Sequence, residues 1–146
     1  MPDTQRQQIM AALGARLATI RTANGYRTNI GASVLEDPVD EQEPGDLPVV
    51  MYRDTDAATV AEMSRHHHTI SIEIGVTMAG ATPLPEIRKV CDDVAKAIGV
   101  DPSFGALAIT AAPPSSGWDV YGDGADLVTG IIFKFTIEYR TTEWTT

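Results

Sequence analysis

The sequence contains little cysteine, little basic charge and no long apolar run. Cys91 is the only cysteine among 146 residues, so an intramolecular disulfide is excluded. The 11 basic residues against 20 acidic ones give a formal net charge of −9. This charge argues against a nucleic-acid reader, which needs a basic face, and against docking on an anionic membrane. The longest uncharged run, 103–118, holds two glycines and two prolines, which excludes a membrane helix.

What the sequence does contain is typical of one folded domain. Hydrophobic residues make up 43% of the chain, close to the globular average. The length matches the commonest domain size, and no repeat or second-domain boundary is visible, so we expect a single domain over 1–146. No targeting segment is recognisable, and we expect a soluble, intracellular product.

Two helices are predicted from apolar residues spaced three and four apart. The first follows the capping residues at 2–4 and is expected to stop at Asn24-Gly25. Its apolar stripe consists of Ile9, Leu13, Leu17 and Ile20. The second runs from Pro83 or Pro85 to Ile98, and its stripe includes Cys91.

The strands are predicted from alternation and from turn residues. The clearest are 69–78 and 128–140, in which every second residue is apolar. Shorter strands are expected at 26–35, 47–52 and 106–110, and Gly122-Asp123-Gly124 reads as a turn. Strict alternation means one covered and one polar face per strand. The expected fold is therefore α+β, a mostly antiparallel sheet with two helices packed on one face.

The three consecutive histidines, His66 to His68, are the most conspicuous candidate for chemistry. Imidazole is a common metal ligand, but neighbouring side chains of a strand point to opposite faces. Only His66 and His68 could then share an ion, and no further ligand motif completes a site. We interpret the cluster as the solvated start of a strand, with a small metal-binding protein or metalloenzyme as the alternative.

No other residues form a credible catalytic set. Cys91 lies on an apolar stripe beside two aspartates, which favours a buried thiol over a reactive thiolate. Ser115 and Ser116 lack the frame of a nucleophile elbow. The residues themselves therefore predict no catalytic, cofactor or metal site.

Two segments are candidate interaction sites. The stretch 36–46 is rich in carboxylates and proline and has no base, so we expect a mobile loop that is solvated or orders on a partner. Its spacing does not match a calcium-binding EF-hand. The segment 141–146 adds an aromatic residue beyond the last strand, suited either to packing back or to an interface. The candidate residues are Glu36, Asp37, Asp40, Glu41, Glu43, Asp46 and Trp144.

Taken together, the order of elements resembles the tail terminator, or tail completion, proteins of long-tailed bacteriophages, of the minor tail protein U type. The resemblance rests on the first helix, Gly25 to Gly31, the acidic stretch and Leu47-Pro48-Val49-Val50. It continues through the strand 70–78, the proline-led helix and the closing Phe133 to Thr141. It thus spans nearly the whole chain.

The resemblance implies a structural virion protein without enzymatic activity. Such a protein forms a six-membered ring on the head-proximal end of the tail tube, stops tube polymerisation and offers a surface for head–tail joining. The implied partners are copies of itself, the tail tube protein and the connector proteins, with DNA passing through unbound. We further expect acidic residues of 36–46 to line the channel, where they would repel DNA in transit. Another neck or tail-completion protein is the nearest alternative.

Overall fold

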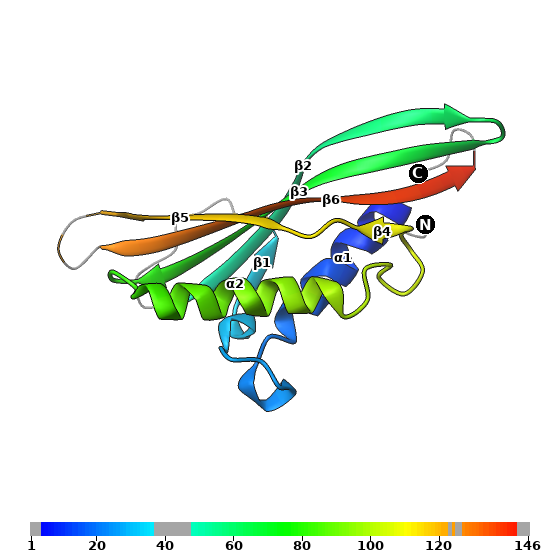
Figure 1. The fold of residues 1–146 in the computed structure, drawn as a ribbon. Helices are drawn as coiled ribbons and strands as arrows, with labels where there is room; N and C mark the ends of the chain where they lie inside the picture. The colour runs from blue at the N-terminus through cyan, green and yellow to red at the C-terminus, as the bar shows by residue number, and fades with distance from the viewer. Residues whose placement is uncertain (1–3, 37–47, 123, 125–126, 143–146) are drawn as a thin grey trace.

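The computed structural model describes residues 4–36, 48–122, 124 and 127–142. They form a six-stranded sheet in the order β1-β2-β3-β6-β4, with β5 also paired to β6. Both helices pack on one face of this sheet (Figure 1). All strand pairs but one are antiparallel, the exception being β1 with β2. The predicted α+β fold is confirmed.

Helix α1 (Gln5–Ala18) begins at Thr4, whose hydroxyl accepts a hydrogen bond from the backbone N–H of Gln7. It ends six residues before the predicted stop. The apolar spacing misled the prediction because Ile20 is buried even though it lies beyond the helix. A 3-10 turn, η1 (Thr22–Asn24), follows, and Gly25 closes that turn with a φ of +88°.

The predicted strand at 26–35 is wrong over most of its length. The structure has a 3-10 turn, η2 (Ile30–Ala32), and only a short strand, β1 (Val34–Glu36). The N–H groups of Arg27 and Thr28 donate to the buried carboxylate of Asp93 instead of to a neighbouring strand. Side-chain hydrogen bonds therefore replace the ladder that a strand would require.

Three long strands carry the sheet: β2 (Val49–Glu62), β3 (Arg65–Ala79) and β6 (Val128–Thr142). The two best strand predictions are confirmed and lengthened at their ends. The predicted strand at 47–52 begins after Pro48 and continues ten residues further, through a bulge between Asp54 and Asp56. The core residues on their helix-facing sides are Val50, Tyr52, Ile70, Ile72, Ile74, Val76, Ile131, Phe133, Phe135, Ile137 and Tyr139.

The predicted strand at 106–110 survives only at its end, as β4 (Thr110–Ala111). Phe104 and Ala106 adopt positive φ values of 49° and 69°, which are turn conformations. Strand β5 (Ser115–Tyr121) was not predicted, because its side chains are exposed on both faces and show no alternation. The glycine turn that follows it is confirmed, with positive φ at both Gly122 and Gly124.

Helix α2 (Leu84–Gly99) matches its predicted bounds and lies across the sheet beside α1. Cys91 is half-buried and packs against the core rather than within it. Neither described helix is long and apolar enough to cross a membrane.

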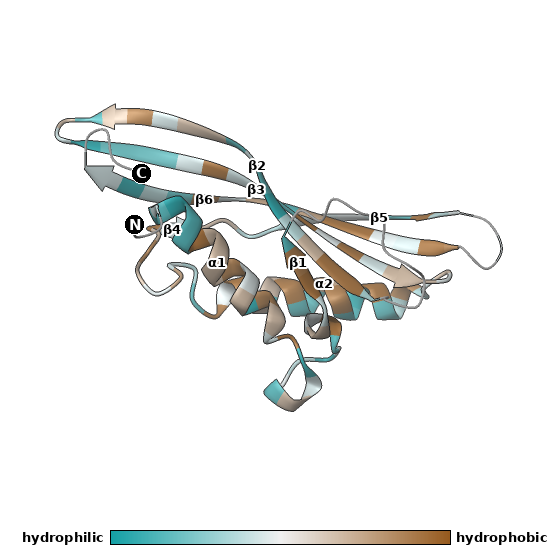
Figure 2. Cartoon of the chain, turned by 180° about the vertical axis from the view of Figure 1, so that it is seen from behind, coloured by the Kyte–Doolittle hydropathy of each residue, from teal (hydrophilic) through white to brown (hydrophobic). Residues whose placement is uncertain are grey.

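The sheet is longer than the helix layer that covers it. The β5–β6 hairpin projects at one end, and β2, β3 and the end of β6 project at the other (Figure 1). We call residues 57–67 of β2 and β3 the arm. Figure 2 shows apolar residues concentrated in the part of the sheet above the helices, whereas the strands of the arm end are mostly polar or neutral. The projecting parts are therefore surfaces without a covering layer.

Candidate assembly surfaces

The face of the sheet opposite the helices, called here the outer face, contains a hollow of about 600 Å³. Glycines create it. Gly75 of β3 and Gly117 of β5 both lie directly opposite Ile132 of β6, one on each side. Ile132 therefore stands between two residues that have no side chain, and it is 40% exposed. Such an apolar knob on a concave wall is suited to contact with another protein.

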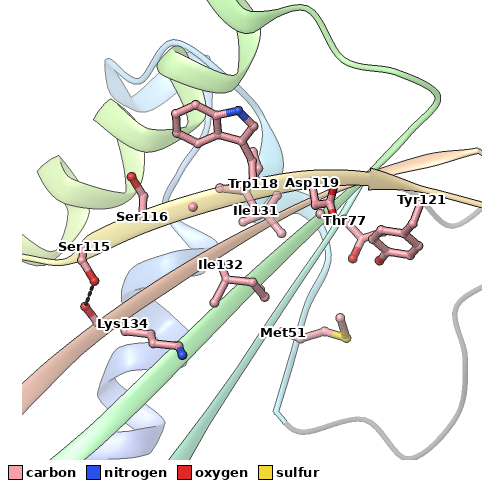
Figure 3. Close-up of a pocket in the computed structure, with 14 residues that line it drawn as sticks. Met51, Thr77, Ser115, Ser116, Trp118, Asp119, Tyr121, Ile131, Ile132 and Lys134 are labelled. Carbon is pink, nitrogen blue, oxygen red and sulfur yellow. Dashed lines mark hydrogen bonds between the residues drawn. The ribbon is translucent and has the colours of Figure 1, made fainter.

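Figure 3 shows which side chains belong to the outer face. Ile132, Met51, Tyr121 and Lys134 point to one side of the sheet, while Trp118 points to the other, toward α2. A Cβ at Gly130 would lie 3.0 Å from Cε1 of Tyr121, so the glycine is what allows the tyrosine ring to lie across it. The hollow thus has mostly apolar walls and two charged lining residues, Asp119 and Lys134.

The serines beside the hollow show no sign of activation. The Ser115 hydroxyl donates to the backbone carbonyl of Lys134 at 3.3 Å (Figure 3). The charged residues that line the hollow are Asp119 and Lys134, and no described histidine lines it. A nucleophilic serine needs a base within hydrogen-bond reach, whereas the hydrogen bond described for Ser115 goes to a backbone carbonyl.

The histidines lie near the tip of the arm, close to the turn between β2 and β3, and His68 makes structural contacts. His68 is 7% exposed, and its two ring nitrogens are hydrogen-bonded to the hydroxyls of Thr59 (2.9 Å) and Thr141 (2.7 Å). The ring also stacks on Tyr139, with centroids 4.6 Å apart. Burial lowers the pKa of His68, with the neighbouring histidines as a smaller cause. Because both nitrogens are engaged, His66 and His68 cannot share an ion without breaking these bonds.

His67 points to the outer face, as the strand geometry predicted. Its Nδ1 lies 3.1 Å from Oε1 of Glu62, and its Nε2 lies 3.5 Å from Oε1 of Glu138. Arg140 adds an ion pair with Glu62 at 3.2 Å. The hydrogen bond from His67 lowers the pKa of Glu62, and Arg140 contributes to the same effect. Among the described residues, no group of three histidine, cysteine or acidic side chains converges to hold a metal ion.

Most of the predicted interface residues cannot be placed. Asp37, Asp40, Glu41, Glu43, Asp46 and Trp144 lie outside the described residues. Glu36 is described: it is exposed at the end of β1, opposite Tyr52. Burial raises the pKa of Tyr52, and the charge of Glu36 adds to the rise. The structure therefore brings none of the predicted acidic residues together within the described part.

Sequence reasoning missed the surfaces that stand out in the structure. Trp118 and Val120 of β5 are 48% and 43% exposed on the helix-facing side. The sequence did contain a signal for the hollow on the outer face. Glycines at neighbouring positions of that face leave a gap that side chains would otherwise fill. It could be read only once the register of the strands was known.

Comparisons with known proteins give the fold and nothing finer. No protein-family model and no curated protein matches the chain. Among solved structures, one whose title states no function aligns with a TM-score of 0.50 and 15% sequence identity. The alignment covers 90% of this chain and 94% of that chain. At this identity the similarity concerns the fold alone.

Proposed function

We propose that the chain is a phage tail terminator. In this role it forms a ring, six-membered by the family resemblance, on the head-proximal end of the tail tube, stops tube polymerisation and offers the surface for head–tail joining. It is a structural, non-enzymatic protein of the virion, and it is assembled in the host cytoplasm. Its partners are copies of itself, the tail tube protein and the head–tail connector proteins.

The observation that carries the proposal is the presence of two different uncovered ends on one sheet. A ring of identical subunits needs two unlike, complementary surfaces on each subunit, because head-to-tail contacts close a ring. The β5–β6 hairpin and the arm are such unlike surfaces and lie at opposite ends of the sheet (Figure 1). The order of elements supports the same role, since the α+β layout is the one that the family resemblance implies.

The outer face supplies a further surface for a partner that is not a copy. The hollow around Ile132 opens on the outer face and is lined by residues of β2, β3, β6 and β5, with Ile132 on the inner strand β6. A terminator must contact the tube protein and the connector as well as its own copies. The net charge of −9 suits a ring through which DNA passes without binding.

The location of the protein in the virion tests the proposal. Gold-labelled antibodies against this chain should bind at the head–tail junction of virions seen by electron microscopy. Antibodies against the tube protein, used as the control, should mark the length of disrupted tails. Label along the tube or at the distal tip, or none on any virion, would contradict the proposal.

A further inference from the structure

On each side of the sheet one strand segment is left without a second described strand: β5, which lies beside β4 along β6, and the arm part of β2, beyond the end of β1. Within the described residues, β1 pairs only with Val50 to Tyr52, and no strand pairs with β2 beyond that point on the same side. Likewise, β5 pairs with β6 and with no second described strand. An unpaired strand edge is a template for another strand.

The hydrogen bonds identify which residues face these free edges. The N–H of Val50 donates to the carbonyl oxygen of Ser33, just before β1, so the backbone groups of Val50 point away from β3. Successive residues of a strand alternate in this direction. We followed this alternation across the paired strands and past the bulge in β2. The residues whose backbone N–H and C=O groups point toward the free edges are Ala57, Thr59 and Ala61 on β2 and Ser116, Trp118 and Val120 on β5.

The N–H of Val120 provides an independent check on this assignment. It donates to the carboxylate of its neighbour Asp119 at 2.8 Å, so it does not face β6. The outward backbone groups of Ser116 and Trp118 have no described backbone partner. The edge is therefore open to a new strand over its central part.

We propose that β5 of one subunit pairs with the arm part of β2 in the next subunit, so that the sheet continues from one copy to another. The proposal rests on the proposed function, because it names the contact that builds the ring. Since β2, β3, β6 and β5 alternate in direction, β5 and β2 run oppositely. A second copy placed beside the first in the same orientation then forms an antiparallel ladder.

Length and charge select one register for this pairing. Seven residues of β2 follow the bulge, Asp56 to Glu62, and β5 also has seven residues. Full overlap places Trp118 opposite Thr59 and Asp119 opposite Ala58. A shift by two residues in one direction would set Asp119 against Asp56, and like charges directly opposite are destabilising. A shift in the other direction would leave two residues at each end of the ladder without a partner.

The side chains fit the same register. Trp118 would lie on the helix-facing side next to Thr59, flanked diagonally by Ala57 and Ala61, all of them small and exposed. Strand β6 shows how far the two edges are offset along the strand direction. The pairing places Thr59 level with Tyr139 of β6 and Trp118 level with Ile131, so the free part of β2 lies eight residues beyond β5. Neighbouring copies are therefore staggered along the strand direction, as strands are in closed barrels.

Cysteine crosslinking tests the pairing. In the Cys91→Ser background, Gly117→Cys and Val60→Cys are made in separate chains and mixed under mild oxidation. In the proposed register these positions form a non-hydrogen-bonded pair with Cα atoms about 4.5 Å apart, within disulfide range. A Cβ at Gly117 meets nothing within 4 Å, and Val60 is 62% exposed, so both variants should fold. Gly99→Cys, also in open space, is the matched control.

The proposal predicts a disulfide between the Gly117→Cys and Val60→Cys chains and none with the control. Adding Trp118→Lys to the first chain should lower the crosslinking yield by about tenfold or more, since it removes the central apolar contact. Val100→Lys, at an exposed apolar residue outside the edges, should leave the yield unchanged.

Three results would overturn the proposal. They are crosslinks between two Gly117→Cys chains alone, which mean a symmetric β5–β5 dimer; crosslinks from Gly117→Cys to Ala58→Cys in place of Val60→Cys; and no crosslinks at all. The result is separable from the proposed function. Crosslinking without tube capping would support the edge pairing and contradict the terminator role. Tube capping without crosslinking would support the terminator role and contradict the edge pairing.

Discussion

Asp93 and Thr28 are joined by two hydrogen bonds to a single carboxylate oxygen. The backbone N–H of Thr28 donates to Oδ2 of Asp93 at 2.8 Å, and its hydroxyl donates to the same atom at 2.5 Å. The N–H of Arg27 donates to the other oxygen at 3.0 Å. Asp93 is only 2% exposed, so helix α2 holds the segment after α1 through a buried carboxylate.

We predict that Asp93→Asn lowers the free energy of unfolding by about 2–3 kcal/mol, because an amide has one acceptor and leaves buried donors unpaired. Urea unfolding monitored by circular dichroism measures the change. Asp92→Asn is the matched control, since its side chain is 65% exposed and lies 3.8 Å from Arg27. That control should change stability by less than about 0.5 kcal/mol. Equal effects of the two variants would contradict the role given to Asp93.

A second prediction concerns Gly31, which lies against the end of α1. A Cβ at this position would lie 2.6 Å from the carbonyl oxygen of Leu17 and 2.8 Å from that of Ala18. Both atoms are backbone, so Gly31→Ala should destabilise the fold by about 1–3 kcal/mol. Gly99→Ala, at the end of α2 with nothing within 4 Å, should be neutral or stabilising by up to about 1 kcal/mol. Thermal unfolding of the two variants gives the comparison, and a neutral Gly31→Ala would contradict the packing.

The third prediction is a pH dependence set by His68. Its pKa in the folded state is lowered from the ordinary value of 6.5, chiefly by burial. The unfolded chain therefore binds a proton at a higher pH than the folded chain does. Stability should be fully present above pH 6.5 and should decline as the pH falls toward the lower, folded-state pKa.

The variant His68→Gln isolates this effect. The groups that face the ring are Thr59, Thr141, Tyr139, His66 and Arg6, and none of them is changed in the variant. Denaturant unfolding between pH 7.5 and 5.5 should show a smaller loss of stability for His68→Gln than for the parent. A parent whose stability rises as the pH falls over this range would contradict the assignment.

The fourth prediction concerns metal content. Because both ring nitrogens of His68 are bonded to threonine hydroxyls, the histidine cluster should not retain a stoichiometric ion. Protein purified without a nickel column should therefore contain well under one equivalent of zinc, nickel or copper by elemental mass spectrometry. One equivalent that disappears in a His66→Ala variant would bring the metal-binding alternative forward.

The sequence was sufficient to predict the fold class and the most regular elements. Helix α2 and the centres of β3 and β6 follow from apolar periods that each element satisfies over its full length. The buried face of each element can be read from the spacing of its own apolar residues, without knowledge of distant contacts. The resemblance to tail terminators used these same elements, and the function it implies stays a prediction.

The errors lie where contacts distant in sequence decide the structure. The segment 26–33 carries strand-forming residues, but Asp93, more than 60 positions away, takes its amides. The arm part of β2 consists mainly of exposed alanine, threonine and valine without an alternating pattern, so it is a strand only because β3 pairs with it over its whole length. Strand β5 is exposed and shows no period. The two sheet edges were missed for the same reason, because an edge is defined by the order of strands rather than by the residues of one strand.

The most direct test of the central proposal is tube length. Purified tail tube protein is polymerised with and without this chain, and the products are imaged by negative-stain electron microscopy. We predict shorter tubes that carry a ring at one end, and tubes of unlimited length when the chain is omitted. The variant Ile132→Asp, which changes the outer face but neither sheet edge, should fold and weaken the capping. Tubes of unchanged length without an end ring, at saturating amounts of the folded chain, would contradict the terminator role.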